Sequence, residues 1–167
     1  MTKIIPEYVF QIPAGISGYE NSASDLSQKG LLRHIENAVS IYMMLTKPEY
    51  TRIKFTQHER DMMLVATMFC DAFKHGWQED YEESHVPKYE HPKIAADVIK
   101  SVDGILSINE LSFIANCIES HMGSNLSEKP DKNGITMPSP DTEYKHLVFI
   151  AHYLATQKDI DIRNNNE

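Results

Sequence analysis

Cysteine is scarce in this chain of 167 residues, and long apolar runs are absent from it. The two cysteines, Cys70 and Cys117, lie in apolar stretches of helical periodicity, which favours buried, reduced thiols over the disulfide framework of a small secreted protein. No apolar run approaches the roughly 20 residues that a membrane span needs. The opening MTKIIPEYVFQIPAG lacks the apolar core of a signal peptide. These absences predict a cytoplasmic protein.

Positive charge is also in short supply. Sixteen Lys and Arg stand against 24 Asp and Glu, which gives a formal net charge of −8 with neutral histidines. This balance argues against duplex nucleic acid and anionic membranes as partners. A small phosphate-bearing substrate stays compatible with it, because a metal ion and a few local cations can reverse the field inside a cleft. The sequence does not determine the oligomeric state, and a homo-oligomer is compatible with it.

The length and composition predict one domain. Hydrophobic residues make up 41% of the chain and charged residues 24%, as in ordinary globular domains. Several Pro and Gly residues in segment 1–23 predict an irregular N-terminal arm. Helical patterns then continue to about residue 160 without a linker, and the polar segment 161–167 is expected to fray. We therefore expect a single helical domain over 24–160.

Apolar residues recur at three- and four-residue steps, and no segment alternates with period two for long. This pattern predicts an all-α bundle of five or six main helices. Local signals support it, since Thr56 with Glu59 is a capping-box pattern, Pro92 suits a first helical turn and Gly123 suits a helix end. Segments 77–89 and 123–140 are predicted to be loops. The five main helices are expected over about 24–45, 56–76, 91–99, 107–121 and 141–158.

Six polar side chains inside or at the ends of these helices are candidate metal ligands: His34, Cys70, Asp71, His91, His121 and His152. Imidazole, thiolate and carboxylate groups all bind transition metals, and helical bundles build metal sites from side chains on facing helices. Each residue also has a simpler interpretation. A histidine can be a hydrogen-bonded core residue or a helix-end residue, a cysteine can be a small buried hydrophobe, and Asp71 can pair with Lys74 or His75.

Five stretches of the sequence resemble the HD-domain metal-dependent phosphohydrolases, especially a small subgroup from bacteria and phages. That subgroup has a G-L-x-x-H helix, a His-Asp-x-x-Lys helix end, an H-P-x-x-A-A helix start, an S-H-M-G helix end and an A-D-Y-L-A-S final helix. The matching stretches occur in the same order and span nearly the whole domain: GLLRH (30–34), CDAFKHG (70–76), HPKIAA (91–96), SHMG (120–123) and AHYLA (151–155).

The resemblance implies an HD-type bundle, one or two divalent transition-metal ions (zinc, iron or manganese) and hydrolysis of a phosphate ester or anhydride, most simply in a nucleotide. It implies a main metal site of His34, Cys70, Asp71 and His152. A second metal, or the substrate phosphate, would lie near Asp71, His91 and His121. Asp71, Lys74, His91 and His121 would be the catalytic residues, with Lys74 contacting phosphate or orienting Asp71.

Two positions depart from the family pattern. Cys70 stands where the family has His, and His152 stands where it has Asp. Two interpretations follow. In one, the site is re-tuned and active, with a softer ligand set that suits zinc or iron. In the other, ordinary metal catalysis is lost and the domain binds a nucleotide or a protein partner without turning it over.

Overall fold

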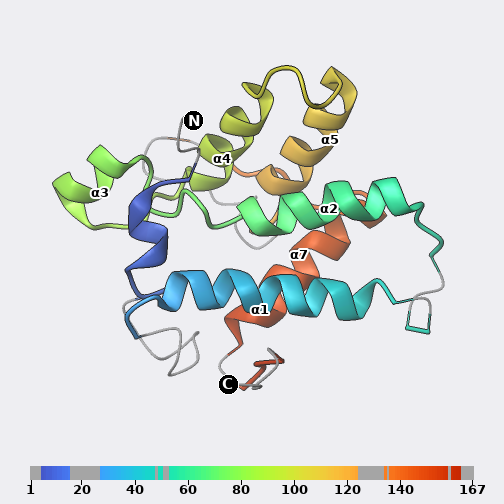
Figure 1. Cartoon of the computed structure of the whole chain (residues 1–167), viewed down its shortest axis with the longest axis horizontal. Coiled ribbons are helices and arrows are strands. Elements are labelled where there is room, and N and C mark those ends of the chain that lie inside the picture. The colour runs from blue at the N-terminus through green and yellow to red at the C-terminus, as the bar shows by residue number, and fades with distance from the viewer. Residues whose placement is uncertain are drawn as a thin grey trace.

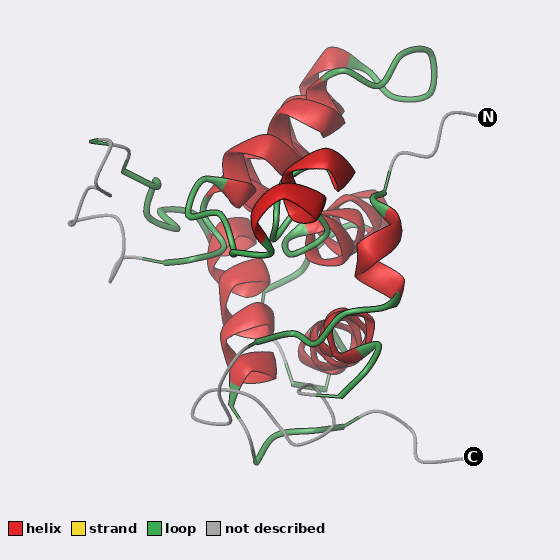
Figure 2. Cartoon of the chain, turned by 90° about the vertical axis from the view of Figure 1, so that its left-hand side faces the viewer, coloured by secondary structure: helices red, strands yellow, loops and turns green. Residues whose placement is uncertain are grey.

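The computed structural model describes residues 5–15, 27–47, 49–50, 53–123, 134, 136–157 and 159–162. Within these ranges every regular element is a helix, which confirms the all-α prediction (Figure 2). No helix of the described residues is long and apolar enough to cross a membrane. The elements in chain order are η1 (Glu7–Phe10), α1 (Gly30–Leu45), α2 (Gln57–Phe69), α3 (Gln78–Ser84), α4 (His91–Lys100), α5 (Ile108–Glu119) and α7 (Glu143–Thr156).

The helices pack as a bundle around α2. Helices α1 and α2 lie side by side and run in opposite directions, and α7 crosses both of them (Figure 1). Helices α4 and α5 form an antiparallel pair that packs on α2 and α7 through α5. The short elements η1 and α3 lie together at the end of the bundle where α1 begins and α2 ends. This arrangement brings the end of α2 close to four other elements.

A single large apolar core joins α1, α2, α4, α5 and α7. Its largest fully buried side chains include Ile41, Met63, Phe73, Ile114 and Ile118. Burying a side chain of this size stabilises the fold by about 1.5–3 kcal/mol before entropy is subtracted. A smaller cluster of Tyr8, Val9, Ile12 and Leu31 attaches the N-terminal segment to α1.

The predicted helix signals are present at the helix ends. The Thr56 hydroxyl accepts from the Glu59 amide at 3.2 Å, and the Glu59 carboxylate accepts from the Thr56 amide at 2.7 Å. Ser107 and Glu110 make the same reciprocal pair before α5. Gly123 follows α5 with φ of +75°, and a Cβ there would lie 2.3 Å from a ring carbon of Phe149. The chain therefore needs glycine at position 123, where it turns beneath α7.

Three features differ from the prediction. Helix α1 begins at Gly30 rather than near residue 24: residues 27–29 form a turn, and residues 24–26 lie outside the described residues. Helix α2 ends at Phe69 rather than near Gly76. Residues 70–76 form tight turns, in which the Lys74 amide donates a hydrogen bond to the Asp71 carbonyl and the Gly76 amide donates one to the Phe73 carbonyl. Helix α3 occupies part of the predicted 77–89 loop. It has seven residues and no buried side chain, so it carries no apolar stripe for the sequence pattern to reveal.

The N-terminal segment is tied to the turns after α2. The Tyr8 hydroxyl donates to the Gly76 carbonyl at 2.7 Å and accepts from the His75 amide at 3.1 Å. Most of the predicted 123–140 loop, residues 1–4 and 16–23 of the predicted arm, and residues 163–167 of the predicted tail lie outside the described residues.

Candidate metal centre

Five of the six candidate ligands meet at the end of α2. His34 comes from α1, Asp71 from the turn after α2, His91 from the first position of α4, His121 from just beyond α5, and His152 from α7. The first four are no more than 5% exposed, and the His152 side chain is 13% exposed. Segments separated by more than 100 residues therefore converge on one buried cluster.

Asp71 lies at the centre of this cluster, and each of its carboxylate oxygens faces its own pair of histidines. Oδ2 lies 3.1 Å from Nε2 of His34 and 2.9 Å from Nε2 of His152. Oδ1 lies 3.2 Å from Nε2 of His91 and 3.9 Å from Nε2 of His121. The result is two groups that share the carboxylate, each with its ligand atoms within 4.8 Å of one another.

The ring orientations of His91 and His121 are fixed by the backbone. Nδ1 of His91 lies 2.7 Å from the Lys88 carbonyl oxygen, and Nδ1 of His121 lies 2.6 Å from the Ile118 carbonyl oxygen. A carbonyl only accepts, so each Nδ1 carries the proton, and in a neutral ring Nε2 then holds a lone pair. The two Nε2 atoms face each other at 3.3 Å. With both rings neutral, two lone pairs and a carboxylate oxygen are directed at one region, which a metal ion or a proton would satisfy.

Burial sets the protonation of this cluster. It lowers the pKa of His121 well below the usual value, and the neighbouring His152 and His91 lower it further. Burial also lowers the pKa of His152, although Asp71 opposes the shift. For Asp71 itself, burial acts to raise the pKa, but Lys74 and His152 together outweigh it and hold that pKa well below its usual range. These shifts favour an ionised Asp71 beside neutral His121 and His152 rings, which is the form in which these groups bind metal.

The separations fit a shared ion. Ligand atoms bonded to one ion at about 2.1 Å, with angles near those of tetrahedral or octahedral coordination, lie about 3.0–3.4 Å apart. Most of the separations in both groups fall close to this range. A backbone carbonyl accepting from the far ring nitrogen is also the usual arrangement of a metal-binding histidine. The buried His/Asp cluster can therefore hold a metal ion.

Cys70, the sixth candidate ligand, lies apart from this arrangement. Its side chain is buried in the main apolar core, and its thiol belongs to neither ligand group. Burial raises the pKa of the Cys70 thiol well above its ordinary value, and the adjacent Asp71 charge adds to the shift. A protonated thiol is a poor ligand. The structure thus gives Cys70 the simpler role, a small core residue, and corrects the four-ligand set that included it.

Lys74 lies one turn beyond Asp71, as expected. Its ammonium nitrogen is 3.6 Å from Oδ2 of Asp71, and the side chain is 20% exposed. It therefore contacts the buried carboxylate from a partly exposed side chain. This position agrees with either predicted role, orienting Asp71 or meeting a phosphate.

A cavity of about 430 Å³ opens beside the cluster and is lined by Asp71, His91, His121 and His152. Two cationic residues and three aromatic residues complete much of its lining: Lys74, Lys88, Tyr89, Phe149 and Tyr153. The sequence patterns do not single out Lys88. Its carbonyl accepts from His91, its amide donates to the Lys74 carbonyl at 2.8 Å, and its ammonium pairs with Asp80 of α3. The only sequence signal was its position just before the His-Pro helix start.

Comparisons with protein-family models, with curated proteins and with solved structures find no match for this chain. The chemistry of the cluster and its cavity is thus the basis for assigning a function.

Proposed function

We propose that the protein is a metal-dependent phosphohydrolase that acts on a phosphate ester or anhydride, with a nucleotide as the substrate class. The observation that carries the proposal is the single carboxylate of Asp71 shared by two pairs of imidazole nitrogens. The HD-like motif order in the sequence supports the same assignment. The adjacent cavity is of the size typical of small-molecule sites, roughly 300–1,000 Å³.

The residues divide into two ligand groups. His34, Asp71 and His152 would hold one ion, and Asp71, His91 and His121 would hold a second. The fixed tautomers of His91 and His121 favour ligand roles over contacts to phosphate, because an Nε2 without a proton cannot donate to a phosphate oxygen. A divalent metal held here supplies Lewis acidity, which polarises a phosphoryl oxygen and strengthens water as a nucleophile near neutral pH.

The donor set narrows the choice of metal. Four imidazoles and one carboxylate suit zinc, iron or manganese. Because Cys70 is absent from both groups, the softest predicted donor is missing. The chain is therefore expected to use manganese or iron at least as well as zinc.

The cavity residues suggest how a nucleotide would be held. The hydrolysis forms a bond between water oxygen and phosphorus and breaks the bond from phosphorus to the leaving oxygen, which takes up a proton. Lys74, with its charged end at the cavity, would neutralise charge that develops on the phosphate oxygens. Asp71 stays ionised and so would not act as the proton donor. The rings of Tyr89, Phe149 and Tyr153 offer stacking surfaces for a nucleobase.

The test is a hydrolysis panel of nucleoside mono-, di- and triphosphates with Mn²⁺, Fe²⁺, Zn²⁺ or Mg²⁺ added to metal-free protein. The wild-type protein should release phosphate or pyrophosphate with at least one ion. Asp71→Asn, which keeps the shape of the side chain and removes its charge, should abolish this release. Asp97→Asn is the matched control, because the Asp97 side chain is 62% exposed and belongs to neither ligand group.

A second outcome of the panel defines the non-catalytic alternative. Binding of metal and nucleotide by the wild-type protein, with no turnover for any substrate or ion, would mark the domain as a binding module. Absence of metal binding and of turnover would reject both functions.

A further inference from the structure

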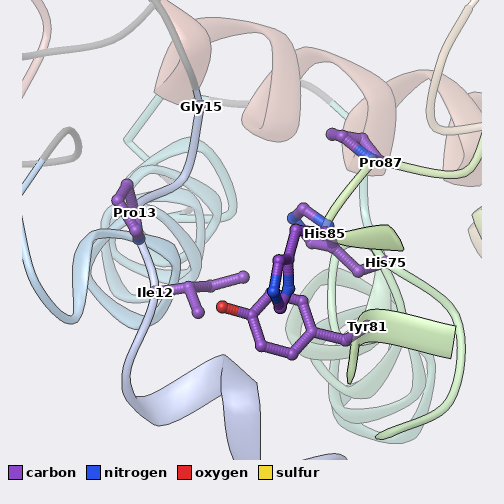
Figure 3. A pocket seen from close by; sticks show the side chains of 7 residues that line it. All are labelled: Ile12, Pro13, Gly15, His75, Tyr81, His85 and Pro87. Atoms are coloured by element: carbon purple, nitrogen blue, oxygen red, sulfur yellow. The ribbon is translucent and has the colours of Figure 1, made fainter. Parts of the chain in front are cut away.

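A second cavity, of about 390 Å³, lies between the N-terminal segment and α3 (Figure 3). Three residues of the N-terminal segment face three rings across it: Ile12, Pro13 and Gly15 lie opposite His75 from the turns after α2, Tyr81 from α3 and His85 just after α3. Its size falls within the range of roughly 300–1,000 Å³ that is typical of small-molecule sites.

One wall of this cavity is a continuous set of aromatic rings. The ring of Tyr81 lies 5.4 Å from that of His75 and 4.5 Å from that of His85, measured between centroids. The Tyr81 hydroxyl points toward Ile12 on the opposite wall (Figure 3). The ring planes of His85 and His75 are turned by 58° and 85° from that of Tyr81, so this wall offers both ring faces and ring edges to a planar ligand lying against Ile12 and Pro13 in the slot between the two walls.

The charge of the slot differs from that of the metal cavity. Among the described residues that line it there is no Asp, Glu, Lys or Arg. Burial lowers the pKa of His75 to about 4, with Lys74 and His91 adding to the shift, so this imidazole is neutral at pH 7. A phosphate or carboxylate would find no counter-ion here. The chemistry therefore selects an uncharged ligand.

The slot is nevertheless not purely apolar. His75 is 7% exposed, and its Nδ1 atom has no hydrogen-bond partner among the described residues. An unmet buried polar atom is unfavourable by about 1–3 kcal/mol. A ligand with polar atoms around its ring edge can supply donors and acceptors to the imidazoles and to the Tyr81 hydroxyl, whichever tautomer they adopt.

We propose that this cavity is a binding site for a neutral heteroaromatic ring of nucleobase size, held between the rings of Tyr81 and His85 on one side and the Ile12–Pro13 segment on the other. The site is separate from the metal cluster, but Pro87 lines both cavities. A ligand bound in the slot would therefore also contact the segment that carries Lys88. The inference does not depend on phosphohydrolase activity, because binding is measured on its own.

The experiment is a titration of the full-length protein with adenosine, guanosine, cytidine and uridine, followed by NMR of the histidine side chains. Indole serves as an apolar ring of similar size. His85→Asn is the main variant, because His85 has φ of +51° and Asn tolerates this backbone conformation. Pro13→Trp is a second variant that fills the slot from an exposed position. Tyr153→Ala, which alters only the metal cavity, is the matched control.

At least one nucleoside should shift the ring resonances of His75 and His85 with a dissociation constant below about 1 mM. His85→Asn should weaken that binding by about tenfold, as loss of one stacking surface does, and Pro13→Trp should weaken it at least as much. Tyr153→Ala should leave it unchanged. The proposal is overturned if no nucleoside shifts these resonances, if indole binds as tightly as the nucleosides, or if Tyr153→Ala weakens binding as much as His85→Asn.

Discussion

His91 and His121 direct their Nε2 atoms at each other across 3.3 Å while backbone carbonyls hold the opposite nitrogen of each ring. Neither ring can satisfy the other without a proton or a metal ion between them. Because a backbone carbonyl does not titrate, it holds each ring in the same orientation whatever the pH. It also means that the two histidine pairs around Asp71 can be tested separately.

Removing one histidine from each pair should remove one ion at a time. His34→Gln should lose the ion of the first group, and His121→Gln should lose the ion of the second, because each change leaves all three ligands of the other group in place. The loss of affinity at the altered group should exceed the roughly 10- to 100-fold effect of changing a residue that only supports a ligand. Elemental analysis of the two variants measures this. Loss of all metal in both variants would instead indicate a single ion held by the whole cluster.

Cys70→Ala should leave the metal content unchanged, because the thiol lies in the apolar core outside both ligand groups. It should still lower the free energy of unfolding by about 1–2 kcal/mol, as loss of a buried atom does. Cys117→Ala, in the same core, is the matched control, and the two variants should behave alike. A selective loss of metal from Cys70→Ala would restore the thiol to the ligand set.

The Cys70 result marks one limit of sequence reasoning. A motif places Cys70 beside Asp71 in the chain, but only the turns after α2 decide which of two adjacent side chains enters the cluster and which enters the core. The five other ligand candidates were predictable, since each lies on a predicted helical segment or just beyond a helix end, in the order of the HD-like motifs. Helix α3 and the role of Lys88 were not, because a short helix without buried residues has no periodic pattern and Lys88 acts largely through its backbone atoms.

The second cavity could not be predicted from the sequence, for a related reason. It joins Ile12 and Pro13 to Tyr81 and His85, and nothing in either segment specifies that contact. The hydrogen bonds of Tyr8 to the backbone of His75 and Gly76 bring the two segments together.

His75 should make the protein less stable in acid. Its pKa is lowered from 6.5 to about 4, so between these values the unfolded chain binds a proton that the folded protein does not. The free energy of unfolding should therefore fall as the pH drops from 6.5 to 4, by about 3 kcal/mol from this residue. Urea denaturation of metal-free protein across this range measures the fall. His75→Phe, which keeps a ring, should show a flatter dependence, and an identical dependence in both proteins would contradict the assignment.

Gly76→Ala should destabilise the protein more than Gly104→Ala. Both glycines have φ near +80°, but a Cβ at Gly76 would lie 2.5 Å from Oδ2 of Asp80, whereas a Cβ at Gly104 would meet nothing within 4 Å. Gly104→Ala should therefore cost about 1 kcal/mol from backbone strain alone, and Gly76→Ala about 1–3 kcal/mol more. Thermal denaturation of the two variants gives the comparison. Equal losses would mean that Asp80 moves away freely.

The metal content of the protein, purified without chelator and then titrated with manganese, iron and zinc, tests the central claim most directly. The account predicts one or two equivalents of a transition metal in the wild-type protein and none in Asp71→Asn, with both proteins folded by circular dichroism. Less than about a tenth of an equivalent in the wild-type protein, with none regained on titration, would contradict it, because a ligand set this well ordered should bind such ions tightly.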